Sequence, residues 1–281
     1  MKKLSMLITG SNGLIAKTFI SQYKDKFKFY KCTKKNNLDY FLKKKPDIIF
    51  NTAGEQYNEK KMVETNLLYV IKLLNYARNN NTNLITLGSS AEYGVRDFPT
   101  NEETLPKPAT KYEATKSAAS MMVTGYSRAY ALKTIVVRPY SVYGHYSKND
   151  RLIPMIINSI NKNLKMRIYR GFHDFIYVID FNQGIFNLIK NRNKWTSGEI
   201  VNLGSGKQYS NFEVLKTIQK IFGKANGKFK KINKFYRKWD SNMWVCDTKY
   251  VFKKYGFKTK FSLEKGLADY KKRLENNETS Y

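Results

Sequence analysis

The sequence has little of what marks secreted, metal-binding or membrane-spanning proteins. Its 281 residues include two cysteines, Cys32 and Cys246, at a separation that fits no metal site, so we expect free thiols in a reducing compartment. No apolar run approaches the roughly 20 residues that span a bilayer. The apolar stretch after Met1 is too short for a secretion signal. These absences predict a soluble, cytoplasmic protein with neither a bound metal nor a membrane partner.

Acidic residues are also scarce. The chain has 22 of them against 51 lysines and arginines, a formal net charge of +29. Such a charge is compatible with nucleic-acid binding. The lysines are dispersed, however, and no nucleic-acid motif is present, so we favour a generally lysine-rich surface. A positive field would equally suit an anionic small substrate. Because 42% of the residues are apolar, we expect a sizeable core and exclude global disorder.

The N-terminal segment has the pattern of a dinucleotide site. A short apolar strand, Leu4–Thr9, runs into a glycine turn, and a helix follows from Lys17. Glycines let the backbone approach a pyrophosphate, which then sits on the helix N-terminus. An ordinary strand-to-helix turn is the alternative. We predict that a cofactor is bound here by Gly10, Ser11, Asn12, Gly13, Leu14 and Ile15.

The end of the second predicted strand bears on the choice of cofactor. A dinucleotide fold usually places an acid there, which binds the adenosine ribose. In this chain the residues at that point are Thr33, Lys34 and Lys35. Two cations and no acid favour a ribose 2′-phosphate, so NADP(H) is predicted, with NAD(H) as the other candidate. The alternative is that these are ordinary surface lysines.

Strands and helices continue to alternate along the chain. Further strands are predicted at Ile48–Asn51, Leu84–Leu87 and Ile135–Val137, with a long helix over Met62–Arg78 between the first two. This order is typical of a doubly wound parallel sheet, a Rossmann-like α/β fold with its site along the carboxyl edge. Along that edge we predict further cofactor contacts from Asp39, Asn51, Ala53, Gly54, Asn66, Tyr140 and Val142.

The alternation becomes less regular after Gly144. We therefore predict a dinucleotide-binding domain over residues 1–140, to which 174–200 returns. Residues 141–173 and 201–281 are expected to form a smaller substrate-binding lobe.

Tyr112 and Lys116 are four residues apart in a stretch that predicts a helix from Tyr112 to Leu132. Residues with this spacing share one helix face. The ammonium of Lys116 would then favour the phenolate of Tyr112 and lower its pKa from the usual value of about 10. A tyrosine tuned in this way can exchange a proton with a carbonyl or an alcohol near neutral pH. Taken alone, the pair is better explained as part of a solvated helix face, because the chain is rich in tyrosine and lysine.

Other motifs recur in a fixed order along nearly the whole chain. They are Gly10-x-x-Gly13-x-x-Ala16, Ser89 ahead of Tyr112 and Lys116, Glu102 with Pro106 and Pro108, Arg138-Pro139 through Tyr143-Gly144, Asp174 to Val178, Asn202 to Gly206, and Arg237 with Asp240. In this order and spacing they resemble the extended short-chain dehydrogenase/reductases that act on nucleotide sugars.

The resemblance implies a function and a set of roles. Ser89, Tyr112 and Lys116 would be the catalytic triad, and the enzyme would belong to activated-sugar biosynthesis for surface polysaccharide. A homodimer is implied through the helices Met62–Arg78 and Tyr112–Leu132. Apolar residues available for its interface are Leu67, Val70, Met121 and Met122. Contacts to the nucleotide-sugar substrate are expected from Gln56, Ser90, Ser141, Tyr169, His173 and Arg237.

Two substitutions depart from the family pattern on the phosphate side of the substrate site. Ser141 stands where an asparagine usually holds the substrate diphosphate, and His173 stands where an arginine usually does. Arg167 or Arg170 could compensate for the missing charge.

A third departure narrows the reaction. The 4,6-dehydratases of the family carry a glutamate where this chain has Ala91, and Glu92 is one residue out of register. A dehydratase needs that acid, so we set this activity aside. We predict NADPH-dependent reduction of the C4 keto group of a nucleoside-diphosphate-4-keto-6-deoxysugar. The alternatives are an NAD-dependent nucleotide-sugar 4-epimerase with the same triad, and a non-catalytic dinucleotide sensor or nucleic-acid-binding protein.

Overall fold

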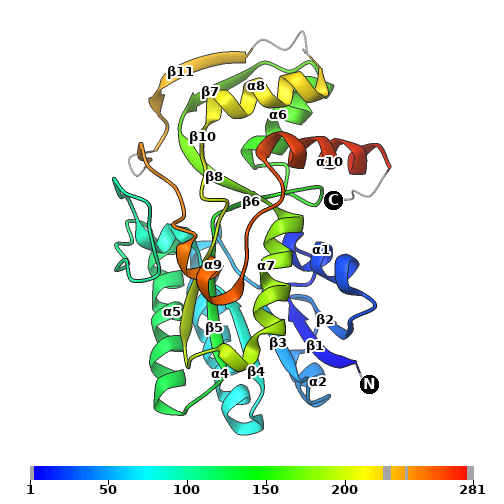
Figure 1. Cartoon of the computed structure of the whole chain (residues 1–281), viewed down its shortest axis with the longest axis vertical. Coiled ribbons are helices and arrows are strands. Elements are labelled where there is room, and N and C mark those ends of the chain that lie inside the picture. Colours follow the sequence, from blue (N-terminus) through cyan, green and yellow to red (C-terminus); the bar gives the residue numbers. More distant parts are fainter. Residues whose placement is uncertain (1–2, 224–228, 238–239, 277–281) are drawn as a thin grey trace.

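The computed structural model describes residues 3–223, 229–237 and 240–276, which form a larger and a smaller part, one above the other in Figure 1. In the larger part, six described strands form one parallel sheet in the order β2-β1-β3-β4-β5-β9. They are β1 (Leu4–Thr9), β2 (Phe27–Cys32), β3 (Ile48–Asn51), β4 (Asn83–Leu87), β5 (Thr134–Pro139) and β9 (Glu199–Leu203). The predicted doubly wound parallel sheet is confirmed.

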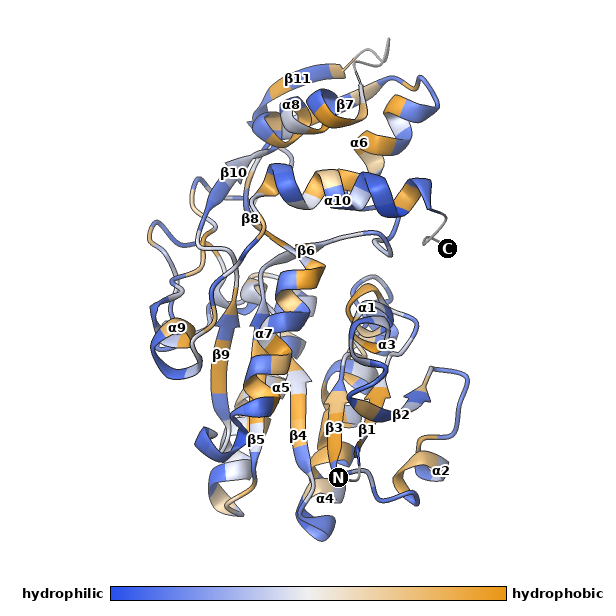
Figure 2. Cartoon of the chain, turned by 45° about the vertical axis from the view of Figure 1, so that its right-hand side comes forward, coloured by the Kyte–Doolittle hydropathy of each residue, from blue (hydrophilic) through white to orange (hydrophobic). Residues whose placement is uncertain are grey.

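Helices cover both faces of this sheet. On one face lie α1 (Leu14–Tyr23) and α7 (Val178–Lys190), and on the other lie α2 (Leu38–Leu42), α4 (Tyr69–Asn80) and α5 (Lys111–Ala129). Parallel strands covered in this way are apolar on both faces. Figure 2 shows that the central strands are hydrophobic along most of their length.

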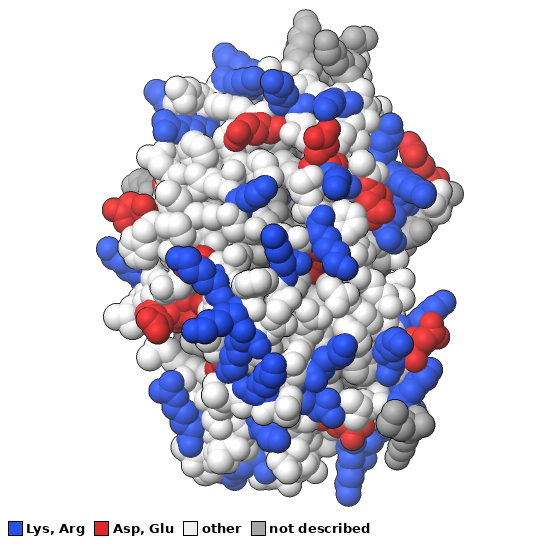
Figure 3. Space-filling model, viewed as in Figure 1, with Lys and Arg blue, Asp and Glu red and all other residues white. Residues whose placement is uncertain are grey.

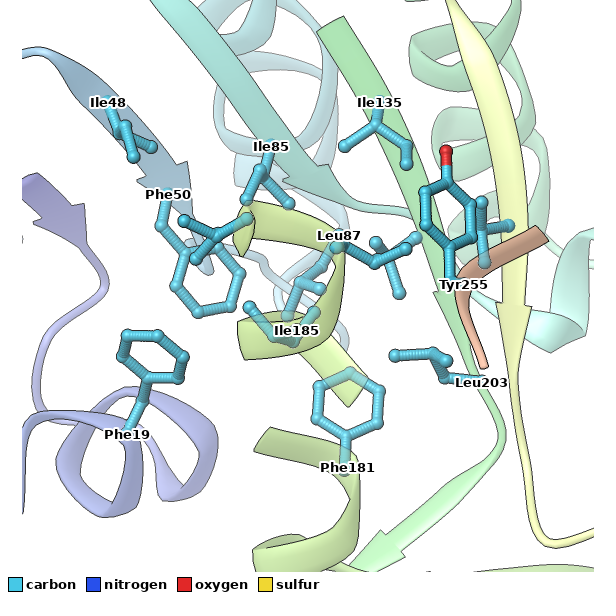
Figure 4. Close-up of a cluster of buried hydrophobic side chains, with 14 of the residues drawn as sticks. Phe19, Ile48, Phe50, Ile85, Leu87, Ile135, Phe181, Ile185, Leu203 and Tyr255 are labelled. Carbon is cyan, nitrogen blue, oxygen red and sulfur yellow. The ribbon is translucent and has the colours of Figure 1, made fainter. Parts of the chain in front are cut away.

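Successive side chains of each strand enter opposite cores. In β1, Met6 and Ile8 pack toward α1 and α7, while Leu7 packs toward α4 and α5. Figure 4 shows the first of these cores, where Phe181 and Ile185 of α7 face apolar side chains of the sheet. The two-sided burial fixes the register of the strands, since a slip of one residue would exchange the two sets of side chains.

The helix predicted over Met62–Arg78 is interrupted. The structure has α3 (Glu59–Val63), a π-helical turn (Glu64–Leu68) and then α4. The turn carries Asn66, which is fully buried and hydrogen-bonded to the backbone of Glu55 and to the hydroxyl of Thr115 on α5. The interruption therefore lies where the helix approaches the site.

The smaller part has its own apolar core. Its strands are β6 (Ser141–Tyr143), β7 (Met166–Arg170), β8 (Phe172–Tyr177), β10 (Gln208–Ser210) and β11 (Phe229–Phe235). Its helices are α6 (Leu152–Asn161), α8 (Asn211–Phe222) and α10 (Leu263–Glu275). β10, β8 and β6 form one small sheet, and β7 pairs with β11 in a second. The side chains of these elements enclose a cluster centred on α6, α8 and α10.

The chain leaves the larger part later than the sequence suggested. The lobe boundary expected at residue 201 falls inside β9, whose Val201 and Leu203 are buried in the core of the main sheet. α9 (Lys249–Tyr255) also packs there through Val251 and Tyr255. β9 extends the sheet because it continues the parallel pairing of β5.

Surface charge is spread over both parts. Figure 3 shows lysines and arginines from end to end of the visible face, with acidic residues among them. Within the described ranges, no helix is both long and apolar enough to cross a bilayer. Nor do those residues include a group of three His, Cys, Asp or Glu side chains arranged to hold a metal ion.

Candidate active site

The helix that carries Tyr112 begins at a well-defined point. Thr110 is the N-cap of α5, and its hydroxyl accepts a hydrogen bond from the backbone N–H of Glu113 at 3.3 Å. The Glu113 carboxylate in turn accepts from the backbone N–H groups of Ala109 and Thr110, at 2.6 and 3.1 Å. This capping box fixes the start of the helix, so Tyr112 lies in its first turn and Lys116 one turn later.

Ser89 is held in position by a second capping box. It follows β4 and caps the short 3₁₀ helix Ser90–Tyr93, where its hydroxyl accepts from the N–H of Ala91 at 3.1 Å. The Ser89 hydroxyl also hydrogen-bonds to the phenol of Tyr112, which acts to lower the pKa of that phenol. The structure thus brings the predicted Ser89 and Tyr112 into direct contact.

The expected pKa of Tyr112 is wrong in direction. Burial raises the pKa of the phenol above its usual value, and the opposing effects of the Ser89 hydrogen bond and the charge of Arg151 are smaller. Lys116 does not reverse this shift, because its ammonium donates to the carbonyl of Leu87 at 2.6 Å. At neutral pH the phenol is therefore protonated, which is the form of a proton donor.

Lys116 is buried beside the predicted cofactor edge. A Cβ added to Gly54 would lie 3.6 Å from the Lys116 Nζ, so the ammonium is a close neighbour of this glycine. Burial lowers the pKa of Lys116 to about 8, although the carboxylate of Glu92 acts in the opposite direction. Lys116 therefore changes charge within the range in which enzymes are usually assayed.

The glycine turn after β1 has the geometry that its sequence predicted. Gly10 has a φ of +66°, and a Cβ there would lie 2.8 Å from the backbone nitrogen of Ala53. Only glycine fits this combination of left-handed backbone and close approach. Ser11, Asn12 and Gly13 complete the turn, and Leu14 and Ile15 open α1. The turn therefore presents backbone groups at a helix N-terminus, as a pyrophosphate site requires.

The turn after β2 exposes two cations. The hydroxyl and backbone N–H of Thr33 both donate to the side-chain oxygen of Asn36, at 2.8 Å each. This closes the turn and leaves Lys34 and Lys35 exposed to solvent. Asp39, predicted as a cofactor contact, is half-exposed on α2 and pairs with Lys72 at 2.8 Å.

Three predicted cofactor residues are buried with their polar groups already bonded. The amide of Asn51 accepts from Thr9 at 2.6 Å and donates to Thr86 at 2.9 Å, which joins the ends of β1, β3 and β4. Asn66 joins Glu55 to α5, as described above. The hydroxyl of Tyr140 hydrogen-bonds to Thr100. These side chains hold the edge of the sheet together, whereas Ala53 and Val142 lie along it partly buried.

On the substrate side, His173 cannot replace an arginine. It is in β8, and burial together with the charge of Arg237 lowers its pKa to about 4, against the opposing charge of Asp240. The imidazole is neutral at physiological pH. Arg167 is exposed on β7, and Arg170 donates to Asn242 at 2.6 Å. Neither is shown to supply the missing charge near Tyr112.

Arg151 is the cation that the sequence interpretation missed. It precedes α6, donates to the side chain of the predicted substrate residue Gln56, and its charge acts on the pKa of Tyr112. It also acts on Tyr57, whose pKa is raised by burial and by its hydrogen bond to Asp150. As one of 51 basic residues, Arg151 carried no local signal. Its contact with Gln56 forms because the segment before α6 folds against the loop that follows β3.

The remaining predicted substrate residues lie on several elements. Ser90 is buried at the start of the 3₁₀ helix, Ser141 is in β6, and Tyr169 is in β7. Arg237 follows β11. Its charge acts to lower the pKa of Tyr57, but burial is the larger effect and raises that pKa overall. The charges of Arg151 and Arg237 both act on the pKa of Tyr57, and the charge of Arg151 also acts on the pKa of Tyr112.

Comparison with known proteins identifies the family. The family model described as "NAD dependent epimerase/dehydratase family" matches residues 6–204, which is more than half of the chain. The chain belongs to this family. The match covers the main sheet through β9 and includes Ser89, Tyr112 and Lys116.

Individual members of the NAD-dependent epimerase/dehydratase family are more distant. The chain is 26% identical over 208 residues to dTDP-glucose 4,6-dehydratase 1 of Escherichia coli, a match that covers 63% of this chain and 57% of that protein. The matched segment thus spans a little over half the length of that relative.

Solved structures of the family share the fold. The dTDP-glucose 4,6-dehydratase of Bacillus anthracis, in complex with NAD, has a TM-score of 0.86 at 20% identity and covers 98% of this chain and 97% of its own. The UDP-glucose 4-epimerase of Thermotoga maritima, solved with UDP-glucose, has a TM-score of 0.87 at 18% identity. The match covers 98% of this chain and 99% of that protein.

A buried ion pair holds the segment that carries Ser89 in place. Arg138 of β5 and Glu92 are both almost fully buried, and the guanidinium donates to one carboxylate oxygen through Nε at 2.9 Å and Nη2 at 2.8 Å. The other oxygen accepts from the backbone of Ser89 at 2.7 Å and the hydroxyl of Ser120 at 3.0 Å. Burial raises the pKa of Glu92, but four donors and no acceptor face it, so the carboxylate form is the one satisfied.

Removing this carboxylate should be costly to the fold. Glu92→Gln leaves Arg138 buried without its partner, so the free energy of unfolding should fall by about 3–5 kcal/mol, measured by urea denaturation. Glu264→Gln is the matched control, because Glu264 pairs with Lys220 at 2.7 Å on the surface. It should leave the denaturation midpoint nearly unchanged. Equal losses in both variants would contradict a supporting role for the buried pair.

Proposed function

We propose that this protein reduces the C4 keto group of a nucleoside-diphosphate-4-keto-6-deoxysugar with NADPH. The observation that carries the proposal is the contact between Ser89 and the protonated phenol of Tyr112, one helical turn before the buried Lys116. Reduction of a ketone consumes one proton at the carbonyl oxygen, so its enzyme needs an acid at rest. A raised pKa keeps Tyr112 in that state.

The chain's own residues account for the proton and for the orientation of the substrate. A reduced nicotinamide supplies a hydride when bound, and the glycine turn after β1 fits its pyrophosphate. Tyr112 gives its proton to the oxygen on C4 as negative charge develops there. Ser89 donates a hydrogen bond to the same oxygen. Lys116, charged below a pKa of about 8, lies buried beside the cofactor edge and would hold the nicotinamide ribose.

Dehydration is disfavoured by the environment of Glu92. The residue in register with the extra acid of the dehydratases is Ala91, which has no ionisable group. Glu92 itself is fully buried and bonded to Arg138, Ser89 and Ser120. No carboxylate is therefore available at that point for removing water from C5 and C6.

A nucleotide-sugar 4-epimerase is the second candidate. It is favoured by the fold shared with the UDP-glucose 4-epimerase of Thermotoga maritima and by the NAD bound in the Bacillus anthracis structure. An epimerase first removes a proton from a C4 hydroxyl, which requires a base. The protonated state of Tyr112 suits that first step less well than it suits ketone reduction.

Turnover tests the reaction. We expect oxidation of NADPH with one or more 4-keto-6-deoxy sugar nucleotides, followed by absorbance, and a loss of roughly 10²–10⁴-fold in kcat for Tyr112→Phe. In the active protein kcat/KM should fall as pH rises through about 8, where Lys116 loses its proton. Near-full activity of Tyr112→Phe would remove the phenol from the mechanism. Interconversion of C4 epimers without external NADPH would favour the epimerase.

Cofactor preference gives an independent test. Lys34 and Lys35 are exposed where an adenosine ribose is expected, and a charge-assisted contact with a 2′-phosphate contributes about 1.5–3 kcal/mol, or roughly ten- to a hundred-fold in affinity. Calorimetry should show NADPH binding more tightly than NADH by that factor. The double variant Lys34→Ala, Lys35→Ala should lose the difference and bind NADH as before.

A matched control comes from the opposite end of β2. Lys24 and Lys26 are exposed in the turn between α1 and β2, so replacing both with alanine should leave the preference for NADPH intact. Equal affinities for the two cofactors in the unmutated protein, or NAD retained through purification, would contradict the NADPH assignment.

We also propose a homodimer through α4 and α5. Of the four residues expected at the interface, Val70 is buried within the protomer and Leu67 is partly buried, whereas Met121 and Met122 are exposed. Leu68 on the π-helical turn is exposed as well. Such an apolar face on two adjacent helices suits a two-fold contact.

The mass in solution tests this arrangement. Light scattering at micromolar protein should give a dimer, and Met121→Asp should shift it toward the monomer because a charge would then enter an apolar contact. Met155→Asp, at another exposed methionine on α6, should remain dimeric. A monomeric mass for the unmutated protein would exclude the proposal.

A further inference from the structure

Lysines and tyrosines alternate along one edge of the main sheet. β2 is the last strand at that edge, and α2 lies beside it (Figure 1). The ammonium of Lys28 lies over the ring of Tyr30, with 5.6 Å between the nitrogen and the ring centroid. Lys44, just after α2, lies over the same ring at 5.6 Å and over the ring of Tyr40 at 4.4 Å. We call these four residues, in the order Lys28, Tyr30, Lys44 and Tyr40, the lysine–tyrosine ladder.

The core holds the two rings of the ladder in place. Tyr30 is half-buried and packs against the apolar cluster between the sheet and α4. On α2, Leu38 and Leu42 are buried one turn apart, and Tyr40 is left on the outer face with 60% of its surface exposed. The carbonyl of Leu42 accepts from the phenol of Tyr76 on α4 at 2.8 Å, which fixes the end of α2. The ring of Tyr40 is therefore positioned by the fold and open to solvent.

The cations of the ladder are not neutralised by carboxylates. Four exposed lysines belong to it or flank it, namely Lys28, Lys43, Lys44 and Lys45. Among the residues that the structure describes, none of these four forms an ion pair. Of the acids close to them in sequence, Asp39 pairs with Lys72 at 2.8 Å, and Asp47 accepts from the backbone and hydroxyl of Ser5, both at 2.7 Å. The edge therefore attracts anions.

An alternation of cations and rings suits a single strand of nucleic acid. Such a strand presents phosphates and flat bases in turn, and proteins bind it with cations that follow the backbone and with rings on which the bases stack. Exposed cation–π contacts are weak, so Lys28 and Lys44 can exchange them for phosphates. A duplex fits less well, because its bases are already stacked on one another and leave no free face for Tyr40.

We propose that the lysine–tyrosine ladder binds single-stranded nucleic acid, with a base stacked on Tyr40 and phosphates held by Lys28, Lys44 and the flanking lysines. This binding is independent of the reaction at C4. The sequence alone favoured a generally lysine-rich surface, because no local motif contains both Lys28 and Lys44. The fold places the two ammonium groups over one ring, that of Tyr30.

The ladder is distinct from the predicted cofactor contacts. Lys34 and Lys35 are in the turn at the carboxyl end of β2, whereas Lys28 is near the amino end of that strand. Lys44 is in the segment that leads to the amino end of β3. Because a parallel sheet of this kind binds its cofactor at the carboxyl ends of the strands, a nucleic acid on the ladder leaves the cofactor site free.

Fluorescence anisotropy with labelled oligo(U) and oligo(dT), each about 12 nucleotides long, tests the proposal. We expect similar affinities for the two, because stacking and phosphate contacts do not distinguish ribose from deoxyribose. A plot of the logarithm of the affinity against the logarithm of the salt concentration should have a slope of about −2 to −3, as three or four phosphate contacts give. NADPH should not displace either strand.

Two positions of the ladder separate stacking from charge. Tyr40→Ala should weaken the binding of both strands roughly 5- to 100-fold, the usual effect of removing a stacking ring, and Tyr40→Phe should bind within about twofold of the unmutated protein. Lys44→Gln should weaken binding and reduce the steepness of the salt dependence by about 0.7. A duplex of the same length offers no free base face, so Tyr40→Ala should leave its binding unchanged.

Tyr130 and Lys253 provide matched controls. Tyr130 is 48% exposed at the end of α5, and Arg78 lies over its ring at 4.8 Å. Tyr130→Ala therefore removes a comparable ring elsewhere and should leave the affinity unchanged. Lys253 is exposed on α9, and Lys253→Gln should leave the salt dependence unchanged. Because Tyr40 and Lys44 are exposed, their variants should keep the thermal unfolding midpoint of the unmutated protein.

Three outcomes would overturn the proposal. Equal affinity of Tyr40→Ala and the unmutated protein would mean that general charge alone attracts the strand. Displacement by NADPH, together with loss of binding in the variant Lys34→Ala, Lys35→Ala, would place the strand in the cofactor site. Absence of binding at about 50 mM salt, where such contacts are strong, would remove the ligand altogether. The reductase proposal would stand in all three cases, because none of them concerns the oxidation of NADPH.

Discussion

The carboxylate of Glu92 lies where the elements that carry the site meet. One of its oxygens accepts from the backbone of Ser89 and from Ser120 of α5, and the other is held by Arg138 of β5. A buried charge of this kind is stable only when its partners are correctly placed. Glu92 therefore fixes the end of β4 relative to the helix that carries Tyr112, and the contact between Ser89 and Tyr112 depends on it.

A second buried carboxylate has a comparable role in the smaller part. Asp174 of β8 accepts from the backbone and hydroxyl of Ser205, both at 2.7 Å, and from the backbone of Gly206 and Cys246, at 2.9 and 3.1 Å. It thereby joins the loop after β9 to the segment that descends from Arg237 toward α9. Each carboxylate thus joins segments that are far apart in the chain.

The hydrogen bonds of Glu92 limit the reactions that the site can perform. Because Glu92 is used to hold the fold, the acid nearest in sequence to the dehydratase position has no free oxygen to offer a substrate. In the proposed reduction, Tyr112 is the group that gives a proton to the oxygen on C4, and burial raises its pKa. The proposed reaction transfers one hydride and one proton and has no separate elimination step.

Local rules predicted much of the site and missed one property of it. The capping pattern of Thr110 and Glu113 and the spacing of Tyr112 and Lys116 can be recognised along the chain, because they depend on neighbours within one or two helical turns. The pKa of Tyr112 was predicted in the wrong direction. The i, i+4 argument assumed that Lys116 faces the phenol, whereas its ammonium reaches the carbonyl of Leu87 on β4.

The sequence by itself was enough to predict the parallel sheet and the glycine turn. It was also enough to predict Ser89, Tyr112 and Lys116 as candidate catalytic residues. Periodicity, left-handed backbone at Gly10 and motif order are properties of short segments. Only the tertiary structure decided which cations and rings accompany them. Arg151 bonds to Gln56 because loops far apart in the chain converge there, and β9 joins the main sheet because it pairs with β5. Burial, charge proximity and edge pairing arise from packing, so no short segment contains them.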